Sequence, residues 1–146
     1  MWRFQTRSEE ETIQLGREIA ARLPQRAVVL LIGNLGAGKT TLAKGIVSGL
    51  GAAEPDDVTS PTFTLIQEYG RSSQGACVYH VDLYRLDRPE EVARLGLDEI
   101  FDRDAVVLIE WGERFPQLVP ADCIEIRMEA GSADERRIQV TGGPLA

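Results

Sequence analysis

The stretch GNLGAGKTT, residues Gly33–Thr41, directly follows the apolar run AVVLLI, residues Ala27–Ile32. A run that is apolar at every position is typical of a strand buried on both faces of a parallel sheet. After the glycines, Leu42, Ile46 and Val47 recur at helical spacing. A strand, a glycine-rich loop and a helix are therefore expected in immediate succession.

The loop matches the phosphate-binding motif G-x-x-x-x-G-K-[ST] in full. Its glycines let successive backbone N–H groups face a phosphate without an intervening Cβ, and the dipole of the following helix favours an anion there. In such a P-loop, Lys39 is expected to reach the terminal phosphates of ATP, and Thr40 to bind Mg²⁺. The residues expected to contact the nucleotide are Gly33, Asn34, Leu35, Gly36, Ala37, Gly38, Lys39, Thr40 and Thr41.

A P-loop needs an acid at the carboxyl end of a neighbouring strand, where it faces the same crevice. Two acids fit this position, because Glu110 ends the run AVVLIE and Asp82 ends the run CVYHVD. We assign the metal to Glu110 and the attacking water to Asp82. The simpler alternative, that one of the two is a solvated acid at a strand end, stays open.

Three further residues lie near these motifs in the sequence. Thr62, within SPTFT, occupies the place where switch proteins put a hydroxyl that senses the terminal phosphate, although an ordinary proline turn has the same pattern. His80 is the only histidine, and a lone histidine in a strand is expected to be a hydrogen-bonded structural residue. Trp111 is expected to be a packing residue.

The composition indicates a single globular domain, residues 1–146, with 43% hydrophobic and 27% charged residues. Apolar runs are far shorter than a membrane span and the start lacks a signal-peptide core, so a cytoplasmic location is expected. Cys77 and Cys123 are expected to be reduced core residues. A net charge of −7 disfavours direct binding of nucleic acid without partner proteins.

The remaining pattern predicts an α/β fold, a P-loop NTPase-like three-layer sandwich with a mixed, mostly parallel central sheet. A capping box at Ser8–Glu11 predicts a first helix that stops at Pro24. The turn-rich RSSQG predicts a hairpin, and Pro89 begins a helix that continues to about Phe101. The other predicted strands are Phe63–Tyr69, Cys77–Val81, Ala105–Ile109, Cys123–Met128 and Arg136–Val140.

Five segments follow one another in the order GNLGAGKTT, SPTFTLIQEY, VYHVDLYRLDRPEE, LGLDEIF and IEWGERF. In this order they closely resemble the TsaE family, also called YjeE, the bacterial P-loop ATPases of tRNA threonylcarbamoyladenosine biosynthesis. The resemblance spans about Thr12 to Phe115. It is specific because a bare P-loop is widespread, whereas the later segments in this order are not.

The resemblance implies a role for several residues. Thr12 corresponds to the family's N-terminal nucleotide contact, Thr40 and Glu110 to its Mg²⁺ ligands, and Asp82 to its catalytic or water-orienting acid. Thr62 corresponds to its switch threonine. The C-terminal arginine that approaches the nucleotide in relatives corresponds to Arg136 or Arg137, of which Arg137 is assigned to nucleotide binding.

The resemblance also implies a weak ATPase that supports repeated turnover by the TsaD and TsaB subunits, with tRNA contacted only indirectly. Slow hydrolysis is expected because no arginine finger is evident; Arg85 could act as one, although a surface ion pair is the simpler role. Two alternatives stay open. One is a nucleotide-dependent binding module with incidental hydrolysis, and the other is a small-molecule kinase.

Overall fold

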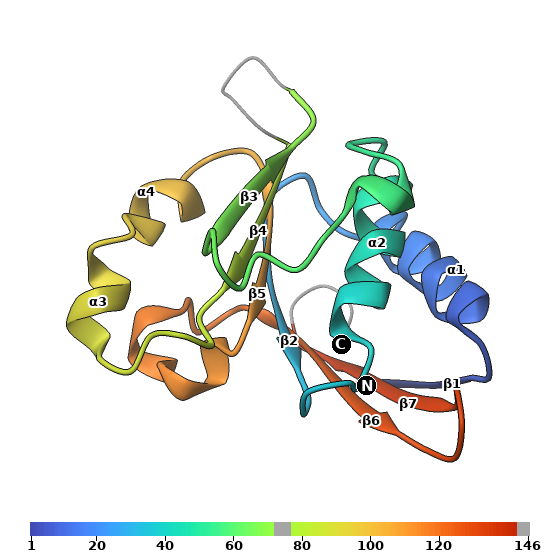
Figure 1. Cartoon of the computed structure of the whole chain (residues 1–146). Coiled ribbons are helices and arrows are strands. Elements are labelled where there is room, and N and C mark those ends of the chain that lie inside the picture. Colours follow the sequence, from blue (N-terminus) through green and yellow to red (C-terminus); the bar gives the residue numbers. More distant parts are fainter. Residues whose placement is uncertain (72–76, 143–146) are drawn as a thin grey trace.

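The computed structural model describes residues 1–71 and 77–142, and seven strands of these residues form one sheet in the order β1-β7-β6-β2-β5-β4-β3 (Figure 1). β2 pairs in parallel with β5 and β6, and β4 pairs in parallel with β5. The other three pairs are antiparallel, so the sheet is mixed, as expected, but only half of its pairing is parallel and the expected parallel majority is absent. The strands are β1 (Trp2–Thr6), β2 (Ala27–Ile32), β3 (Ile66–Tyr69), β4 (Val78–Asp82), β5 (Val106–Glu110), β6 (Ile124–Ala130) and β7 (Arg136–Thr141).

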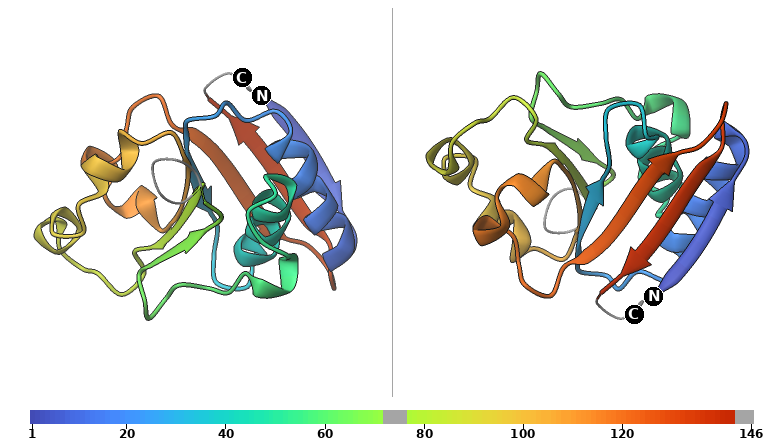
Figure 2. Two further views of the ribbon diagram at one scale, coloured as in Figure 1. Left: turned by 90° about the horizontal axis from the view of Figure 1, so that it is seen from above. Right: turned by 90° about the horizontal axis from the view of Figure 1, so that it is seen from below.

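Helices cover the two faces of the sheet and complete the expected three-layer arrangement. α1 (Glu9–Ala20) and α2 (Lys39–Gly49) lie on one side, and α3 (Pro89–Ala93) and α4 (Leu97–Phe101) lie on the other (Figures 1 and 2). Single turns of 3-10 helix occur at Pro55–Asp57, Gly112–Arg114 and Pro116–Leu118.

Alternation along the central strands divides the hydrophobic core into two halves. Val29 and Leu31 of β2 pack with α1 and α2, whereas Leu30 and Ile32 face the half that contains α4. β4 and β5 are buried along their whole length. Their almost uninterrupted apolar sequences are therefore explained by burial on both faces.

The first helix begins as its sequence predicts. The Ser8 hydroxyl accepts a hydrogen bond from the Glu11 N–H at 3.1 Å. The Glu11 carboxylate in turn accepts from the Arg7 N–H at 3.0 Å, one residue before the position expected in a capping box. The helix ends at Ala20, before Pro24.

Three predictions about secondary structure were wrong. The helix predicted from Pro89 to Phe101 is two short helices, because Gly96 adopts a left-handed conformation with φ 72° between them. The first strand of the hairpin begins at Ile66 instead of Phe63, after Leu65 at φ 70°. β1 was missed altogether; it pairs with the last strand, a partner that short sequence windows do not contain.

The hairpin itself is confirmed, since β3 and β4 are antiparallel neighbours. Most of its predicted turn, RSSQG, lies outside the described residues. Cys77 and Cys123 are free and only half-buried, at the edge of the core instead of inside it. Among the described residues, no helix is long and apolar enough to cross a membrane.

α1 and α2 approach each other at glycines. A Cβ on Gly16 would lie 2.6 Å from the Leu42 carbonyl oxygen, and a Cβ on Gly45 would collide with the Ile13 carbonyl oxygen. This close approach fixes α2, and therefore the glycine loop before it, against the rest of the domain.

We predict that Gly45→Ala destabilises the domain by about 1 to 3 kcal/mol, because overpacking outweighs the better helix propensity of alanine. Urea unfolding measures the difference. Lys44→Ala, a neighbouring half-buried position in α2, is the matched control and should change stability by less than about 0.5 kcal/mol. Equal stability of Gly45→Ala and the wild type would show that the helices do not pack this closely.

Candidate functional site

The glycine loop, both strand-end acids and an arginine surround one cavity of about 280 Å³. The cavity lies beyond the carboxyl ends of β2, β4 and β5, at the first turn of α2, where open α/β sheets bind their ligands. Its lining comprises Leu35, Gly36, Gly38, Lys39, Thr40, Thr41, Ser60, Asp82, Glu110, Trp111 and Arg136.

The loop has the backbone geometry that its glycines permit. Gly36 and Gly38 adopt φ angles of 80° and 100°, a region that other residues rarely occupy. The N–H of Leu42 donates to the Gly38 carbonyl at 2.9 Å, which is the first helical hydrogen bond of α2. The N–H groups that precede it in the first turn have no acceptor within the helix. Such amides at a helix N-terminus are donors suited to an anion.

The other loop residues contribute in different ways. The Asn34 carbonyl accepts from the Ala37 N–H at 3.0 Å and closes the turn. The Ala37 side chain is buried, whereas Leu35 is 69% exposed at the mouth of the cavity. Gly33 lies against β6, where a Cβ would come within 2.7 Å of the Met128 carbonyl oxygen. Only glycine fits at this position.

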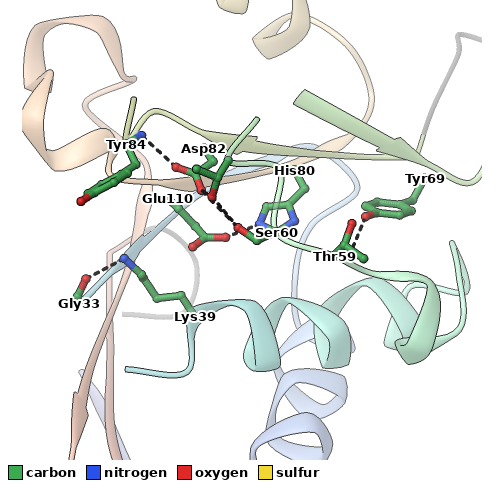
Figure 3. A network of polar contacts seen from close by, with 10 residues as sticks. Gly33, Lys39, Thr59, Ser60, Tyr69, His80, Asp82, Tyr84 and Glu110 are labelled. Atoms are coloured by element: carbon green, nitrogen blue, oxygen red, sulfur yellow. Dashed lines mark hydrogen bonds and ion pairs between the residues drawn. The ribbon is translucent and has the colours of Figure 1, made fainter. Parts of the chain in front are cut away.

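Lys39 is folded back inside the cavity. Its ammonium donates to the Gly33 carbonyl at 2.7 Å and lies 3.7 Å from the centre of the Trp111 ring (Figure 3). Burial lowers the pKa of Lys39 from its usual 10.5, while the carboxylates of Glu110, Glu113 and Asp82 partly oppose that shift. Trp111 therefore faces the site directly, and its interpretation as a packing residue was incomplete.

Asp82 is buried, and hydroxyl and amide groups hold both of its oxygens. Oδ2 accepts from the Thr62 hydroxyl at 2.8 Å and from the Ser60 hydroxyl at 3.4 Å, and Oδ1 accepts from the Tyr84 N–H at 2.9 Å. Figure 3 shows this network on the opposite side of the site from Gly33. The expected switch threonine thus contacts the expected water-orienting acid.

Glu110 is paired with His80. Nε2 of His80 lies 2.6 Å from Oε2 of Glu110, and both side chains are buried. His80 is therefore hydrogen-bonded, as expected, but its partner was missed. Alternation places His80 and Asp82 on one face of β4, yet only the order and register of the strands bring Glu110 beside them.

Of the two C-terminal arginines, Arg136 lies at the glycine loop. Its Nη2 donates to the Gly36 carbonyl at 3.3 Å. Arg137, the residue chosen from the sequence, points to the other face of β7 and pairs with Glu129 at 3.3 Å. The side chains of successive residues in a strand point to opposite faces, so only one of the two can face the loop. The arginine assigned to the nucleotide is therefore Arg136 instead of Arg137.

Thr12 is near the loop but does not line the main cavity. It borders a smaller adjoining hollow of about 140 Å³ with Gly38, Thr41 and Arg136. Thr12 is 2% exposed, and its hydroxyl lies 2.6 Å from that of Thr6. The Thr12 hydroxyl is therefore engaged within the protein.

Arg85 lies outside the lining of the cavity. Its guanidinium is 5.1 Å from the centre of the Phe63 ring, and the described residues give it no ion pair. The surface ion pair expected for Arg85 is thus not found within the described part of the chain. Phe63 is 82% exposed, so Arg85 packs on a ring that projects into solvent.

A larger cavity of about 750 Å³ opens at the other end of the sheet, near Arg26 and Phe101. It holds an exposed ion pair between Arg26 and Asp102, but its lining contains neither a glycine loop nor a lysine. We therefore base the functional assignment on the smaller cavity, where the chemistry converges.

The donor set fits magnesium better than a metal held by protein alone. Within residues 1–71 and 77–142 no group of three or more His, Cys, Asp or Glu side chains could hold a metal ion. The cavity offers the Thr40 hydroxyl and the carboxylates of Glu110 and Asp82. Mg²⁺ is usually bound by one or two carboxylates together with substrate phosphates and water, which suits this arrangement.

A glycine loop between a buried strand and a helix, with its lysine facing two strand-end acids, defines a P-loop domain of the α/β class. The family model "Threonylcarbamoyl adenosine biosynthesis protein TsaE" matches residues 6–138, and the chain belongs to this family. The chain thus has a place in tRNA threonylcarbamoyladenosine biosynthesis.

Individual relatives agree with the family assignment. The chain is 39% identical to TsaE of Rickettsia bellii (strain RML369-C), covering 92% of this chain and 90% of that protein. It is also 39% identical to TsaE of Bacillus subtilis (strain 168), covering 95% and 84%. The crystal structure of Bacillus subtilis YdiB superposes with a TM-score of 0.74 at 34% identity, covering 97% of this chain and 84% of that one.

The buried ammonium of Lys39 gives stability a predictable pH dependence. Between the lowered pKa of the folded chain and the usual 10.5, the unfolded chain holds the lysine proton and the folded chain has lost it. Stability of the wild type relative to Lys39→Met should therefore rise with pH across this window. Urea unfolding over the alkaline range tests this, with Lys44→Met as the control for loss of a lysine from α2. A relative stability that falls over this range would contradict the account.

Proposed function

We propose that the chain binds ATP with Mg²⁺ and hydrolyses it slowly, and that this supports turnover of the complex that forms threonylcarbamoyladenosine in tRNA. The observation that carries the proposal is the single cavity in which the glycine loop faces both Asp82 and Glu110. Membership of the TsaE family supplies the pathway.

The chain's own groups divide the work of binding. The amides of the loop and the first turn of α2 hold the phosphates, and Lys39 leaves the Gly33 carbonyl to contact them. Thr40 and Glu110 are the ligands proposed for Mg²⁺, which would neutralise phosphate charge. Lys39 is partly desolvated beforehand, so an incoming phosphate meets a cation with little water to displace.

Asp82 is proposed to orient the attacking water, and Thr62 to control it. In the structure both oxygens of Asp82 are already engaged, Oδ2 by two hydroxyls and Oδ1 by the Tyr84 N–H. If the terminal phosphate draws the Thr62 hydroxyl away, Oδ2 loses the shorter of its two hydrogen bonds and can accept from water instead. The hydrogen bond between Thr62 and Asp82 is thus proposed as the resting state of a nucleotide switch.

Slow hydrolysis is proposed because the cavity lacks an available arginine. Arg136 is the one arginine that lines the cavity within the described part of the chain. Its guanidinium donates to the carbonyls of Ala133, Glu135 and Gly36, which hold it to the backbone. The cavity lining therefore offers no free arginine to stabilise the transition state, a role worth about 10³ to 10⁵ in rate where it is filled.

Partner proteins are proposed to be TsaD and TsaB, with tRNA contacted only through them. Three of the exposed large apolar side chains, Leu35, Phe63 and Tyr84, lie at the mouth of the cavity or on segments bonded to Asp82. Exposed apolar groups gathered in this way favour a protein interface. The net charge of −7 disfavours direct binding of tRNA. A cytoplasmic location is proposed because it suits the pathway.

The contact between Thr62 and Asp82 also favours a second candidate function. A module that only binds nucleotide would use the same release of Thr62 to reshape the surface around Phe63 for a partner. Hydrolysis would then be incidental. The two functions differ in whether turnover needs the water-orienting acid.

Asp82→Asn should separate them. We predict that this variant still binds ADP and that its ATP hydrolysis falls by about 100-fold or more, because the water loses its charged acceptor. Single-turnover hydrolysis and modification of tRNA with TsaD and TsaB are the measurements. Asp87→Asn, an exposed acid in the same segment, is the matched control.

The ATPase proposal expects one round of modification from Asp82→Asn and repeated rounds from Asp87→Asn. Repeated rounds of modification from an Asp82 variant that binds ADP but does not hydrolyse ATP would support the binding module instead. Unchanged hydrolysis in Asp82→Asn would remove Asp82 from the reaction.

A further inference from the structure

His80 and Glu110 form a buried pair whose role neither the motif nor the family assignment defines. The imidazole is 0% exposed, and its Nε2 lies 2.6 Å from Oε2 of Glu110. Among the described residues, His80 is the only group that hydrogen-bonds the Glu110 carboxylate. The orientation of this carboxylate therefore depends on one side chain.

The hydrogen bonds identify which nitrogen of His80 carries the proton. A carboxylate can only accept, so the proton of this hydrogen bond is on Nε2. Nδ1 is buried and has no hydrogen-bond partner. A proton on Nδ1 would be a buried donor without an acceptor, which costs more than an unused lone pair. The arrangement thus favours a neutral ring with its single proton on Nε2.

We propose that His80 is a positioning residue that holds the Glu110 carboxylate for the metal ion, as the neutral Nε2–H tautomer. The inference rests on the proposed function of Glu110 as a Mg²⁺ ligand. Because the ring is neutral, it orients Oε2 without cancelling the negative charge that a hard cation requires. In Figure 3 the carboxylate lies between the imidazole and Lys39, so its second oxygen is turned away from His80.

The position of His80 in the sheet explains why it can act through Glu110. His80 lies two residues before Asp82 on β4, and Asp82 is the direct neighbour of Glu110 on β5. The imidazole therefore lies below the acid pair, toward the core, and is too deeply buried to meet the phosphates itself. Removing a group that hydrogen-bonds to a metal ligand typically changes metal affinity or activity by about 10- to 100-fold.

The first experiment uses the fact that the chain has one histidine. A nitrogen–hydrogen correlation spectrum of the labelled wild-type protein gives a single imidazole pattern, which assigns the tautomer directly. The proposal expects a neutral ring with the proton on Nε2. A proton on Nδ1, or the averaged pattern of a solvent-exposed ring, would overturn it. This measurement needs no variant and no metal.

The second experiment measures how strongly Mg²⁺ couples to ADP binding. Calorimetry gives the affinity for ADP with Mg²⁺ and with EDTA, and the ratio reports the contribution of the metal. His80→Leu should lower this ratio about tenfold and leave the affinity in EDTA unchanged. His80→Gln places an amide N–H near the position of Nε2 and should restore most of the ratio. If His80 only fills the core, His80→Leu should change the affinity for ADP with Mg²⁺ and with EDTA by the same factor. That result would overturn the proposal.

Glu110→Gln separates failure of this inference from failure of the proposed function. If Glu110→Gln loses the effect of Mg²⁺ while His80→Leu keeps it, Glu110 is a ligand and His80 does not position it. If Glu110→Gln keeps the full effect, the metal assignment of Glu110 fails and the inference fails with it. If His80→Leu does not fold, the tautomer and the behaviour of His80→Gln still decide the matter.

Discussion

Parallel pairing of β2, β5 and β4 brings three strand ends to one edge of the sheet, with Leu31 beside Glu110 and Glu110 beside Asp82. The side chains of β4 and β5 are buried on both faces, so both strands are packed inside the core in this register. A slip by one residue would turn the acids away from the glycine loop. The whole candidate site therefore depends on the packing of two apolar strands against β2. The glycine contacts between α1 and α2 hold the loop itself in place.

The proposed functional groups of the site also contact other groups of the chain. Lys39 is held by the Gly33 carbonyl and the Trp111 ring, and Asp82 is held by the Thr62 hydroxyl. Lys39 and Asp82 thus each have a partner within the chain. On the proposed function, a nucleotide would displace these partners, and its binding would be coupled to a change at the rim of the site. This coupling accounts for both functions considered, since ATPase and binding module begin with the same displacement.

Sequence reasoning succeeded where the signal is local. The strand before Gly33, the helix after it and the cap at Ser8 all follow from short windows, and they are present. It failed where the decisive partner is distant. β1 is defined by pairing with β7, the choice between Arg136 and Arg137 by the direction of a strand, and the partner of His80 by strand order. None of these three features can be predicted without knowing the order and direction of the strands in the sheet. Asp82 and Glu110 could be predicted because each ends an apolar run.

The most direct test of the glycine loop as a phosphate site uses Trp111 as the reporter. The chain has two tryptophans, so Trp2→Phe leaves Trp111 alone beside Lys39. Titration with ADP should change its fluorescence to saturation as the ammonium leaves the ring, and Lys39→Met in the same background should weaken binding by about 10- to 100-fold. A signal that ADP does not alter, together with no binding by calorimetry, would contradict the assignment of this cavity to a nucleotide.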